Sequence, residues 1–287
     1  MGKCRDLMLQ EMQIRGFSEN TQKVYLGRMG QFVGFFMRPP DELALEDIHR
    51  YQVHLTQVEA VSWGVFNQSV AAIRFFYREA IHKEWDIKRI PYQKTGRKLP
   101  VVMSRDEVSA LFGTVENLKH RALLLTVYAG GLRVSETVNL RVSDIDSQRM
   151  VVRVDQGKGR KDRYVMLSPT LLEALRAYWK ATRPQPWLFP GQKPGCHLTR
   201  SAAERVFDQA RDAAGIAKKV TIHSLRHSFA THLLESGTNI RVIQLLLGHR
   251  SLRSTEVYTH VAGNYLSETK SPLDTLPMKK NGPSRKG

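Results

Sequence analysis

The sequence predicts a mainly helical protein with one small β-hairpin or sheet, divided into two domains. Apolar residues recur at the spacing of an α-helix through most of the chain. Two strand-like runs, residues 150–155 and 163–167, flank a turn that contains two glycines. A Pro- and Lys-containing stretch without helical periodicity, residues 84–103, separates the first third from the rest. We therefore expect a helical bundle, a linker and an α+β second domain.

Charge is the unusual feature of the composition. The 287 residues include 44 Lys and Arg against 27 Asp and Glu, a net charge of +17, and most of the excess lies after residue 100. Such a charge favours a polyanionic partner such as DNA, although a solvated basic surface has the same composition. The two cysteines lie far apart, and no apolar run reaches the ~18 residues of a membrane span. We expect a soluble, cytoplasmic protein without membrane contact.

Four helices are expected within residues 1–83. The first ends before Gly16, the second begins at Ser18 and stops before two prolines, and the others cover residues 45–57 and 62–82. This domain contains no nucleotide-binding loop or metal cluster. Its basic residues are candidates for phosphate contact or simply solvated side chains: Lys23, Arg28, Arg74 and Arg78.

The linker, residues 84–103, is itself basic. A basic connector suits a protein whose two domains close around a duplex, but a solvated hinge has the same composition. Its candidate DNA contacts are Lys94, Arg97 and Lys98.

The second domain opens with a capping box, Ser104 followed by Glu107, which predicts the start of a helix. A buried helix over residues 120–129 should end at a glycine pair, and a helix of about two turns should follow. Arg133 begins that short helix, with Glu136 three residues on as a possible partner. From its position alone, Arg133 is either a structural or a functional residue.

The hairpin presents Lys158 at its tip, between two glycines. The sequence around it is not a phosphate-binding P-loop, and a lysine at such a tip commonly just makes the turn soluble. Further helices are expected over residues 169–182, 199–214 and 222–236, then a short helix capped by Asn239, and a last helix that starts at Ser254 and carries Tyr258.

The helix over residues 222–236 begins with three polar residues, His223, Arg226 and His227, on one face. Two histidines four residues apart suggest zinc, but Ser224 stands where the metalloprotease motif needs Glu, and the arginine would repel a dication. The elbow motif of serine hydrolases and the aspartate clusters of two-metal nucleases are missing.

Phosphoryl transfer without a metal fits the remaining candidates. Arg133 and Arg226 could hold the non-bridging oxygens of a phosphodiester, because guanidinium offers paired donors and keeps its charge. His223 and His249 could donate hydrogen bonds or move protons, and Lys158 could protonate a leaving alkoxide. The nucleophile would be Tyr258, although a lone tyrosine is more often a packed side chain.

The order of these residues resembles the catalytic domain of the tyrosine recombinases, or phage integrase family. GGLRVSET resembles the first arginine box, which makes Arg133 the first catalytic arginine and Glu136 its acidic neighbour. GKGRKDR resembles the segment with the catalytic lysine, Lys158. The resemblance covers about residues 100–262, and residues 1–83 more weakly resemble the SAM-like core-binding domain.

The remaining motifs lie near the end of the chain. HSLRHSFATHLLESG matches the His-x-x-Arg box, giving His223 and Arg226, and LLLGH matches the box that supplies His249. STEVYTH supplies the nucleophile, Tyr258. The other histidines of this stretch are expected to pack or to cap helices: His227, His232 and His260.

The resemblance implies a mechanism. Tyr258 would attack a DNA phosphate and give a 3′-phosphotyrosine and a free 5′-hydroxyl, without ATP, metal or another cofactor. Two such rounds through a Holliday junction, in a homotetramer on two specific sites, would complete recombination, with a paralogous recombinase as a possible partner. Size and layout resemble the bacterial enzymes that resolve chromosome dimers and the integrases of mobile elements, so the DNA-bound protein would be found on the nucleoid.

The resulting domain division is a core-binding domain, residues 1–83, a linker, a catalytic domain, residues 104–265, and a partly disordered tail, residues 266–287. Arg160 and Lys161 of the hairpin join the expected DNA contacts. Two other functions remain: a sequence-specific DNA-binding protein without strand exchange, and relaxation of DNA like a type IB topoisomerase.

Overall fold

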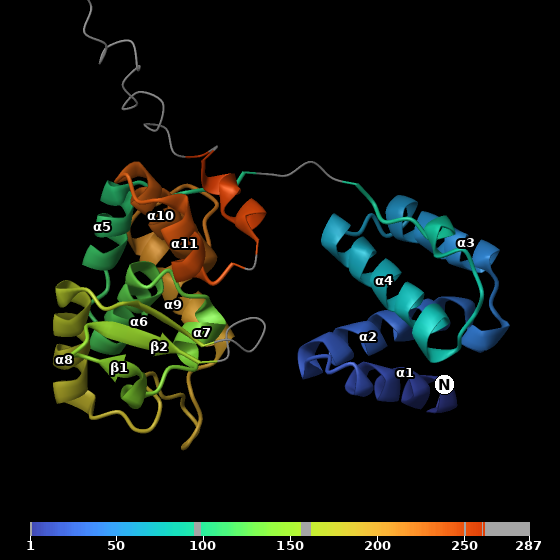
Figure 1. Ribbon diagram of the computed structural model, residues 1–287, viewed down its shortest axis with the longest axis horizontal. Coiled ribbons are helices and arrows are strands. Elements are labelled where there is room, and N and C mark those ends of the chain that lie inside the picture. The colour runs from blue at the N-terminus through green and yellow to red at the C-terminus, as the bar shows by residue number, and fades with distance from the viewer. Residues whose placement is uncertain (1, 95–98, 156–161, 250, 260, 262–287) are drawn as a thin grey trace, which may run out of the picture. The chain divides into compact units, whose positions relative to one another are not determined.

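The computed structural model describes residues 2–94, 99–155, 162–249, 251–259 and 261 (Figure 1). The chain divides into two compact units, residues 1–97 and 98–287. Both are mainly helical, and the second also contains a small antiparallel sheet. None of the helices in the described ranges is long and apolar enough to cross a membrane.

The first unit is a bundle of helices around one apolar core. Its helices are α1 (Gly2–Ile14), α2 (Glu19–Phe36), α3 (Leu45–Gln57) and α4 (Trp63–Phe75), with a 3₁₀ turn, η1 (Pro40–Glu42), between α2 and α3. Ser18 and Ser62 cap α2 and α4, each accepting a hydrogen bond from a backbone N–H three residues on. These caps explain why the sequence predicts both helix starts correctly.

The fourth helix departs from the expected α-helix over residues 62–82. After Phe75 the chain widens into a π-helical turn, η2 (Phe76–Ala80). Phe75, Phe76 and Tyr77 are all buried, and the Tyr77 hydroxyl donates a hydrogen bond to the Pro40 carbonyl at 2.6 Å. Three consecutive aromatic residues are buried where the helix widens. The apolar spacing of the sequence does not predict this wider turn.

Residues 84–94 lie on the first unit. Ile90 is buried in its core, the Trp85 ring lies 4.5 Å from the Tyr77 ring, and Trp63 Nε1 donates to the Gln93 carbonyl at 2.9 Å. A short 3₁₀ turn, η3 (Ile87–Arg89), is part of this segment. The first half of the expected linker is therefore packed chain.

The second unit combines its small sheet with several helices. The chain order is α5 (Arg105–Gly113), α6 (Leu118–Ala129), α7 (Val134–Val138), η4 (Val142–Asp144), β1 (Ile145–Asp146), β2 (Val151–Val154), β3 (Arg163–Met166), α8 (Pro169–Thr182), α9 (Arg200–Ala213), α10 (Ile222–Glu235) and α11 (Ile240–Leu247). The strands pair antiparallel in the order β1-β2-β3, with Val152 opposite both Ile145 and Val165. The sequence predicts β2 and β3 but not β1, because two residues are too few for an alternation to be visible.

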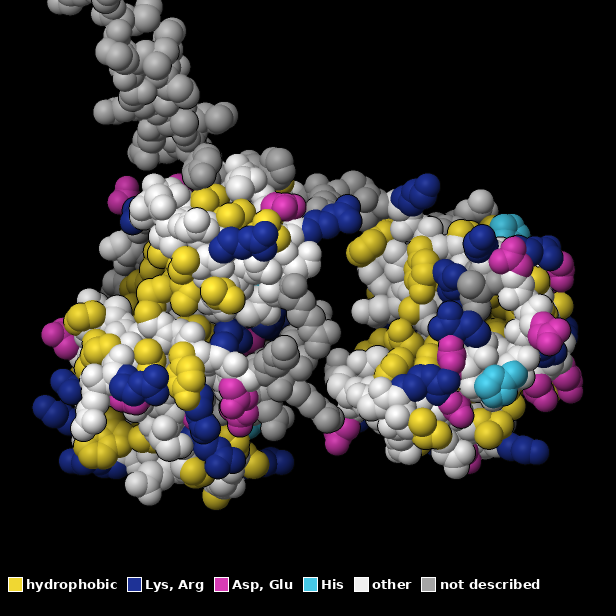
Figure 2. Space-filling model, viewed as in Figure 1, with side chains coloured by type: hydrophobic (Ala, Val, Ile, Leu, Met, Phe, Trp, Pro, Cys, Tyr) yellow, Lys and Arg dark blue, Asp and Glu magenta, His cyan; other side chains and the backbone are white. Residues whose placement is uncertain are grey.

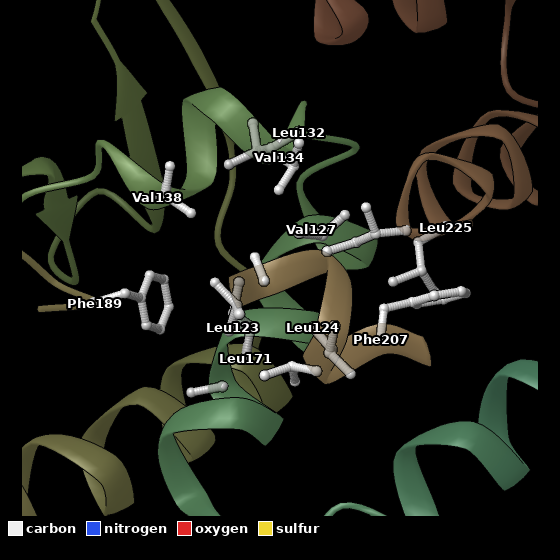
Figure 3. Close-up of a cluster of buried hydrophobic side chains, with 14 of the residues drawn as sticks. Leu123, Leu124, Val127, Leu132, Val134, Val138, Leu171, Phe189, Phe207 and Leu225 are labelled. Carbon is white, nitrogen blue, oxygen red and sulfur yellow. The ribbon is translucent and has the colours of Figure 1, made fainter. Parts of the chain in front are cut away.

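Helix α6 forms the centre of the second unit. It packs against α8 and α10, and its residues Leu123, Leu124 and Val127 are fully buried (Figure 3). The core around them includes side chains from α7, α9 and α10, among them Val138, Phe207 and Leu225. A helix that is apolar on nearly every side is expected at the middle of such a domain. This packing fixes α7 and α10, which supply the polar residues described below.

The last described segment is not the α-helix that the sequence predicts. Two 3₁₀ turns, η5 (Leu252–Ser254) and η6 (Glu256–Tyr258), follow α11 instead. Thr255 between them is buried, and its hydroxyl bonds to the His249 ring at 2.9 Å. Thr255 is therefore held by a contact with a side chain outside the two turns, which the spacing of the sequence does not reveal.

Candidate active site

The carboxylate of Glu136 lies at the centre of a cluster of arginines. It accepts the backbone N–H of Arg133 at 2.8 Å, which caps α7, and the Arg133 guanidinium at 2.6 Å. Arg163 of β3 binds both carboxylate oxygens, at 3.0 and 2.8 Å. Burial alone would raise the pKa of Glu136, but the hydrogen bond and charge of Arg163, with the Arg133 backbone, lower it to about 2. Glu136 is therefore ionised at neutral pH.

Arg226 of α10 approaches the same carboxylate from the core. Its side chain is 1% exposed, and its Nη1 lies 3.8 Å from a Glu136 oxygen. Nη1 also donates to the Gly131 carbonyl and Nη2 to the Leu247 carbonyl, both at 2.6 Å. Burial and the charge of Arg133 lower the pKa of Arg226 to about 10, so it keeps its charge at neutral pH. The guanidinium is held in place by three elements of the chain.

Gly131 makes this arrangement possible. Its φ of +56° lies in the left-handed region, and a Cβ there would stand 2.4 Å from ring atoms of Phe229. A side chain at this position would therefore displace α10, which carries Arg226. Gly130-Gly131 is predicted as a helix stop, and the structure adds the close contact as a second reason for glycine.

Arg163 is a member of the cluster that the sequence analysis did not single out. Besides Glu136 it donates from Nε to the Leu246 carbonyl at 2.9 Å, and its side chain is 11% exposed. Its aliphatic and guanidinium atoms lie against Gly248, where a Cβ would come within 3.2 Å of them. A signal for this role existed, because Arg163 shares a strand face with buried Val165 two residues on. A guanidinium that faces the interior from a strand needs a buried carboxylate to balance its charge.

His223 lies on the first turn of α10, beside a cleft of about 530 Å³. Arg133, Ser135, Thr221 and Arg200 also line the cleft. The His223 side chain is exposed, and its pKa is lowered first by desolvation and then by the charges of Arg226 and Arg133. The cleft gives a ligand access to the exposed edge of the arginine cluster.

His249 lies just past α11 and is half-buried. Its Nδ1 pairs with the Thr255 hydroxyl at 2.9 Å, which leaves Nε2 for another partner. Burial and then the charges of Arg226 and Arg133 lower the pKa of His249 to about 4. It is therefore a neutral imidazole at pH 7.

Tyr258 is held in an apolar pocket of the same unit. Its side chain is 2% exposed among Phe229, Ile243 and Leu247, and its hydroxyl lies 3.0 Å from Nδ1 of His227. Burial raises the pKa of Tyr258, while the charges of Arg226 and Arg133 partly offset that rise. The tyrosine is thus a buried phenol near two guanidiniums.

The structure brings five of the six predicted catalytic residues, with Glu136, into one region: Arg133, His223, Arg226, His249 and Tyr258. Lys158 lies outside the described residues. The prediction that His227 only packs or caps is incomplete, because its ring bonds to the Tyr258 hydroxyl. His232 instead pairs with the Tyr128 hydroxyl at 2.9 Å, and His260 is outside the described residues.

The candidate DNA contacts are spread more widely. Lys23, Arg78 and Lys94 are exposed, Arg28 bonds to Gln31 and Gln68, and Arg74 lies over the Tyr92 ring at 4.8 Å. On the face drawn in Figure 2, Lys and Arg side chains occur on both units, interspersed with acidic ones. The other candidates lie outside the described residues: Arg97, Lys98, Arg160 and Lys161.

Comparison with known proteins gives a consistent result. Residues 101–264 match the model of the phage integrase family, and residues 5–87 match that of the phage integrase N-terminal SAM-like domain. The "Putative integrase/recombinase y4qK" of Sinorhizobium fredii is 49% identical, over 96% of this chain and 90% of that protein. The tyrosine recombinase XerD of Caulobacter vibrioides is 33% identical, over 93% of this chain and 96% of that protein.

The fold also occurs in a solved recombinase with a bound substrate. A crystal structure of the XerH site-specific recombinase, in a post-cleavage complex with a palindromic difH substrate, aligns with a TM-score of 0.70. The alignment covers 87% of this chain and 78% of that one, at 22% identity. With the family match over more than half of the sequence, these findings show that the chain belongs to the phage integrase family and is a tyrosine recombinase, a site-specific enzyme that cuts and rejoins DNA.

Proposed function

We propose that the protein recombines specific DNA sites through a covalent 3′-phosphotyrosine on Tyr258. The phenol attacks the scissile phosphate, the 5′-oxygen leaves as a hydroxyl, and that hydroxyl later attacks the partner duplex. Two rounds pass through a Holliday junction, in a homotetramer on two sites. The observation that carries the proposal is a buried tyrosine beside two guanidiniums that hold a shared carboxylate.

The arginines supply the charge that this reaction needs. Arg133 and Arg226 share Glu136 with Arg163, so three guanidiniums face one carboxylate and positive charge remains in excess. A phosphodiester gains negative charge as the pentavalent transition state forms, and donors fixed beforehand stabilise it without reorganisation. His223 and His249 donate further hydrogen bonds to the phosphate. Lys158 protonates the leaving 5′-oxygen, and neither a metal nor ATP takes part.

The two units have different functions, DNA binding in the first and catalysis in the second. Residues 1–83 bind DNA as the core-binding domain, the chain after residue 94 connects the two units, and residues 104–265 hold the chemistry. The XerH structure contains a palindromic difH substrate, and we infer that this chain holds duplex DNA, with exposed basic residues such as Lys23 and Arg78 on its phosphates.

The test is covalent trapping on DNA. A pool of duplexes with randomised half-sites carries a nick that lets the cleaved 5′-end diffuse away, so that religation fails. Native protein should form an adduct that survives denaturing electrophoresis, and repeated selection should enrich one sequence. Tyr258→Phe should bind the enriched duplex and form no adduct. An adduct with Tyr258→Phe would contradict the nucleophile, and binding by the native chain without any adduct would favour a DNA-binding protein without chemistry.

A further inference from the structure

The hydroxyl of Tyr258 has a specific partner on α10. Nδ1 of His227 lies 3.0 Å from it, and the two rings are 5.7 Å apart with a tilt of 52°. Tyr258 is almost fully buried, so this contact replaces the hydration of its hydroxyl. The pair joins α10 to η6 through two residues that are 31 positions apart in sequence.

The neighbouring histidines are engaged differently. Nδ1 of His249 pairs with the Thr255 hydroxyl, and Nδ1 of His232 pairs with the hydroxyl of Tyr128. The His223 ring packs edge-on against His227 with 4.6 Å between centroids. Among the histidine contacts of the described residues, the one with the Tyr258 oxygen is made by His227.

The direction of this hydrogen bond follows from the protonation states. Desolvation, then the nearby His223 and the charge of Arg226, lower the pKa of His227 to about 4, so its ring is neutral at pH 7. Burial raises the pKa of Tyr258, so the phenol keeps its proton. With the His227 proton on Nε2, the phenol donates to Nδ1 and its oxygen lone pairs are free to face a phosphorus atom.

We propose that His227 is a catalytic residue that accepts the phenolic proton of Tyr258 when the tyrosine attacks the scissile phosphate. The inference rests on the proposed function, because it requires Tyr258 to be the nucleophile. It names the base that removes the phenolic proton of Tyr258. Without it, the candidates for this proton transfer are His223 and His249.

The step balances as follows. The Tyr258 oxygen forms a bond to phosphorus while the bond from phosphorus to the 5′-oxygen breaks. The phenolic proton moves to Nδ1 of His227, and the 5′-oxygen takes a proton from the general acid of the site, Lys158 in the proposed function. In religation each transfer runs backwards, and the His227 imidazolium returns its proton to the departing tyrosine.

Bound DNA makes His227 a stronger base. In the free protein the charge of Arg226 disfavours a proton on the His227 ring. A scissile phosphate brings negative charge to the arginines, and more develops as the fifth oxygen bonds. Both changes favour the imidazolium, so proton transfer becomes less costly as the tyrosine attacks.

His227→Asn and a matched control test this role. Asparagine keeps a hydrogen-bond acceptor near the Nδ1 position but is not a base. His232→Asn makes the same change in the other His–Tyr pair of α10, whose hydrogen bond is 2.9 Å long and does not involve Tyr258. The probe is the nicked duplex enriched from the randomised pool, and the readout is the single-turnover rate of adduct formation, with duplex binding and thermal unfolding measured for each variant.

We expect His227→Asn to slow adduct formation by about 100-fold or more, the usual range for loss of a general base, with duplex binding retained. His232→Asn should react at the native rate. A duplex with sulfur in place of the scissile 5′-oxygen needs no acid to expel its leaving group, and the His227→Asn defect should persist on it. Replacement of tyrosine by the more acidic 3-fluorotyrosine should speed His227→Asn more than the native chain.

A His227→Asn chain that forms the adduct within a few-fold of the native rate would overturn the inference. So would equal effects of 3-fluorotyrosine on both chains, because a purely structural role of His227 leaves the dependence of the rate on phenol acidity unchanged. These outcomes differ from failure of the proposed function, in which the native chain itself forms no adduct.

Discussion

At the scale of single residues, Glu136 organises the site. A carboxylate shared by Arg133, Arg163 and Arg226 lets three like charges lie close together in a partly buried place. Removing one partner from a buried ion pair typically costs about 3–5 kcal/mol, because the remaining charges are left uncompensated. Glu136 is therefore needed both for the position of the guanidiniums and for the stability of the second unit.

Gly131 gives a sharp test at this scale. Gly131→Ala should destabilise the second unit by roughly 2–4 kcal/mol, because the new Cβ would stand 2.4 Å from the Phe229 ring at a φ of +56°. Gly237→Ala is the matched control, since its φ is +79° but nothing lies within 4 Å of the added Cβ. It should cost about 1 kcal/mol from backbone strain alone. Thermal unfolding of both variants measures the difference, and equal losses would show that the Phe229 contact does not matter.

At the scale of elements, α10 and the segment after it contain histidines that are neutral at pH 7. The pKa of His227 and that of His249 are both lowered to about 4, from a usual value near 6.5, by burial and by neighbouring positive charge. Burial also lowers the pKa of His232 on the same helix. Folding therefore disfavours protonation of this region, and the unfolded chain binds protons more readily.

The second unit should consequently lose stability in mild acid. The stabilisation from these histidines is fully present above pH 6.5 and is lost as the pH falls toward 4. Between pH 7 and pH 5 we expect the pKa shifts of His227 and His249 to lower the free energy of unfolding by roughly 2–4 kcal/mol, visible as a lower Tm in calorimetry.

The variant His227→Gln/His249→Gln provides the control, because it has no imidazole to protonate at either position. It should show a smaller drop in Tm between pH 7 and pH 5 than the native chain. An unchanged native Tm between these values, or an equal drop in the double variant, would contradict this explanation.

At the scale of the whole molecule, the sequence predicts most of the fold because its signals are local. Serine caps and apolar periodicity mark α2 and α4, and the glycine pair ends α6 where expected. Strand β1 and the π turn after Phe75 were missed, because neither leaves a periodic pattern. The 3₁₀ turns lie on either side of Thr255, whose bond to the His249 ring is visible only in the tertiary structure.

The candidate site shows the same limit. The order of the family motifs identifies residues such as Arg133 and Arg226 from the sequence alone. The partners of those residues depend on contacts between distant segments, as in the Arg163 bond to Glu136 and the His227 bond to Tyr258. No sequence spacing distinguishes His227, whose ring contacts Tyr258, from His232, whose ring contacts Tyr128.

The central claim is that DNA becomes attached to Tyr258, and peptide mapping of the trapped adduct tests it most directly. Trypsin cleaves after Arg253 and Lys270, so the nucleophile should lie in the peptide between them. After nuclease digestion, tandem mass spectrometry should locate the phosphonucleotide on Tyr258. A phosphonucleotide on Tyr265 of the same peptide, on another tyrosine such as Tyr128, or on a serine or histidine would contradict the account.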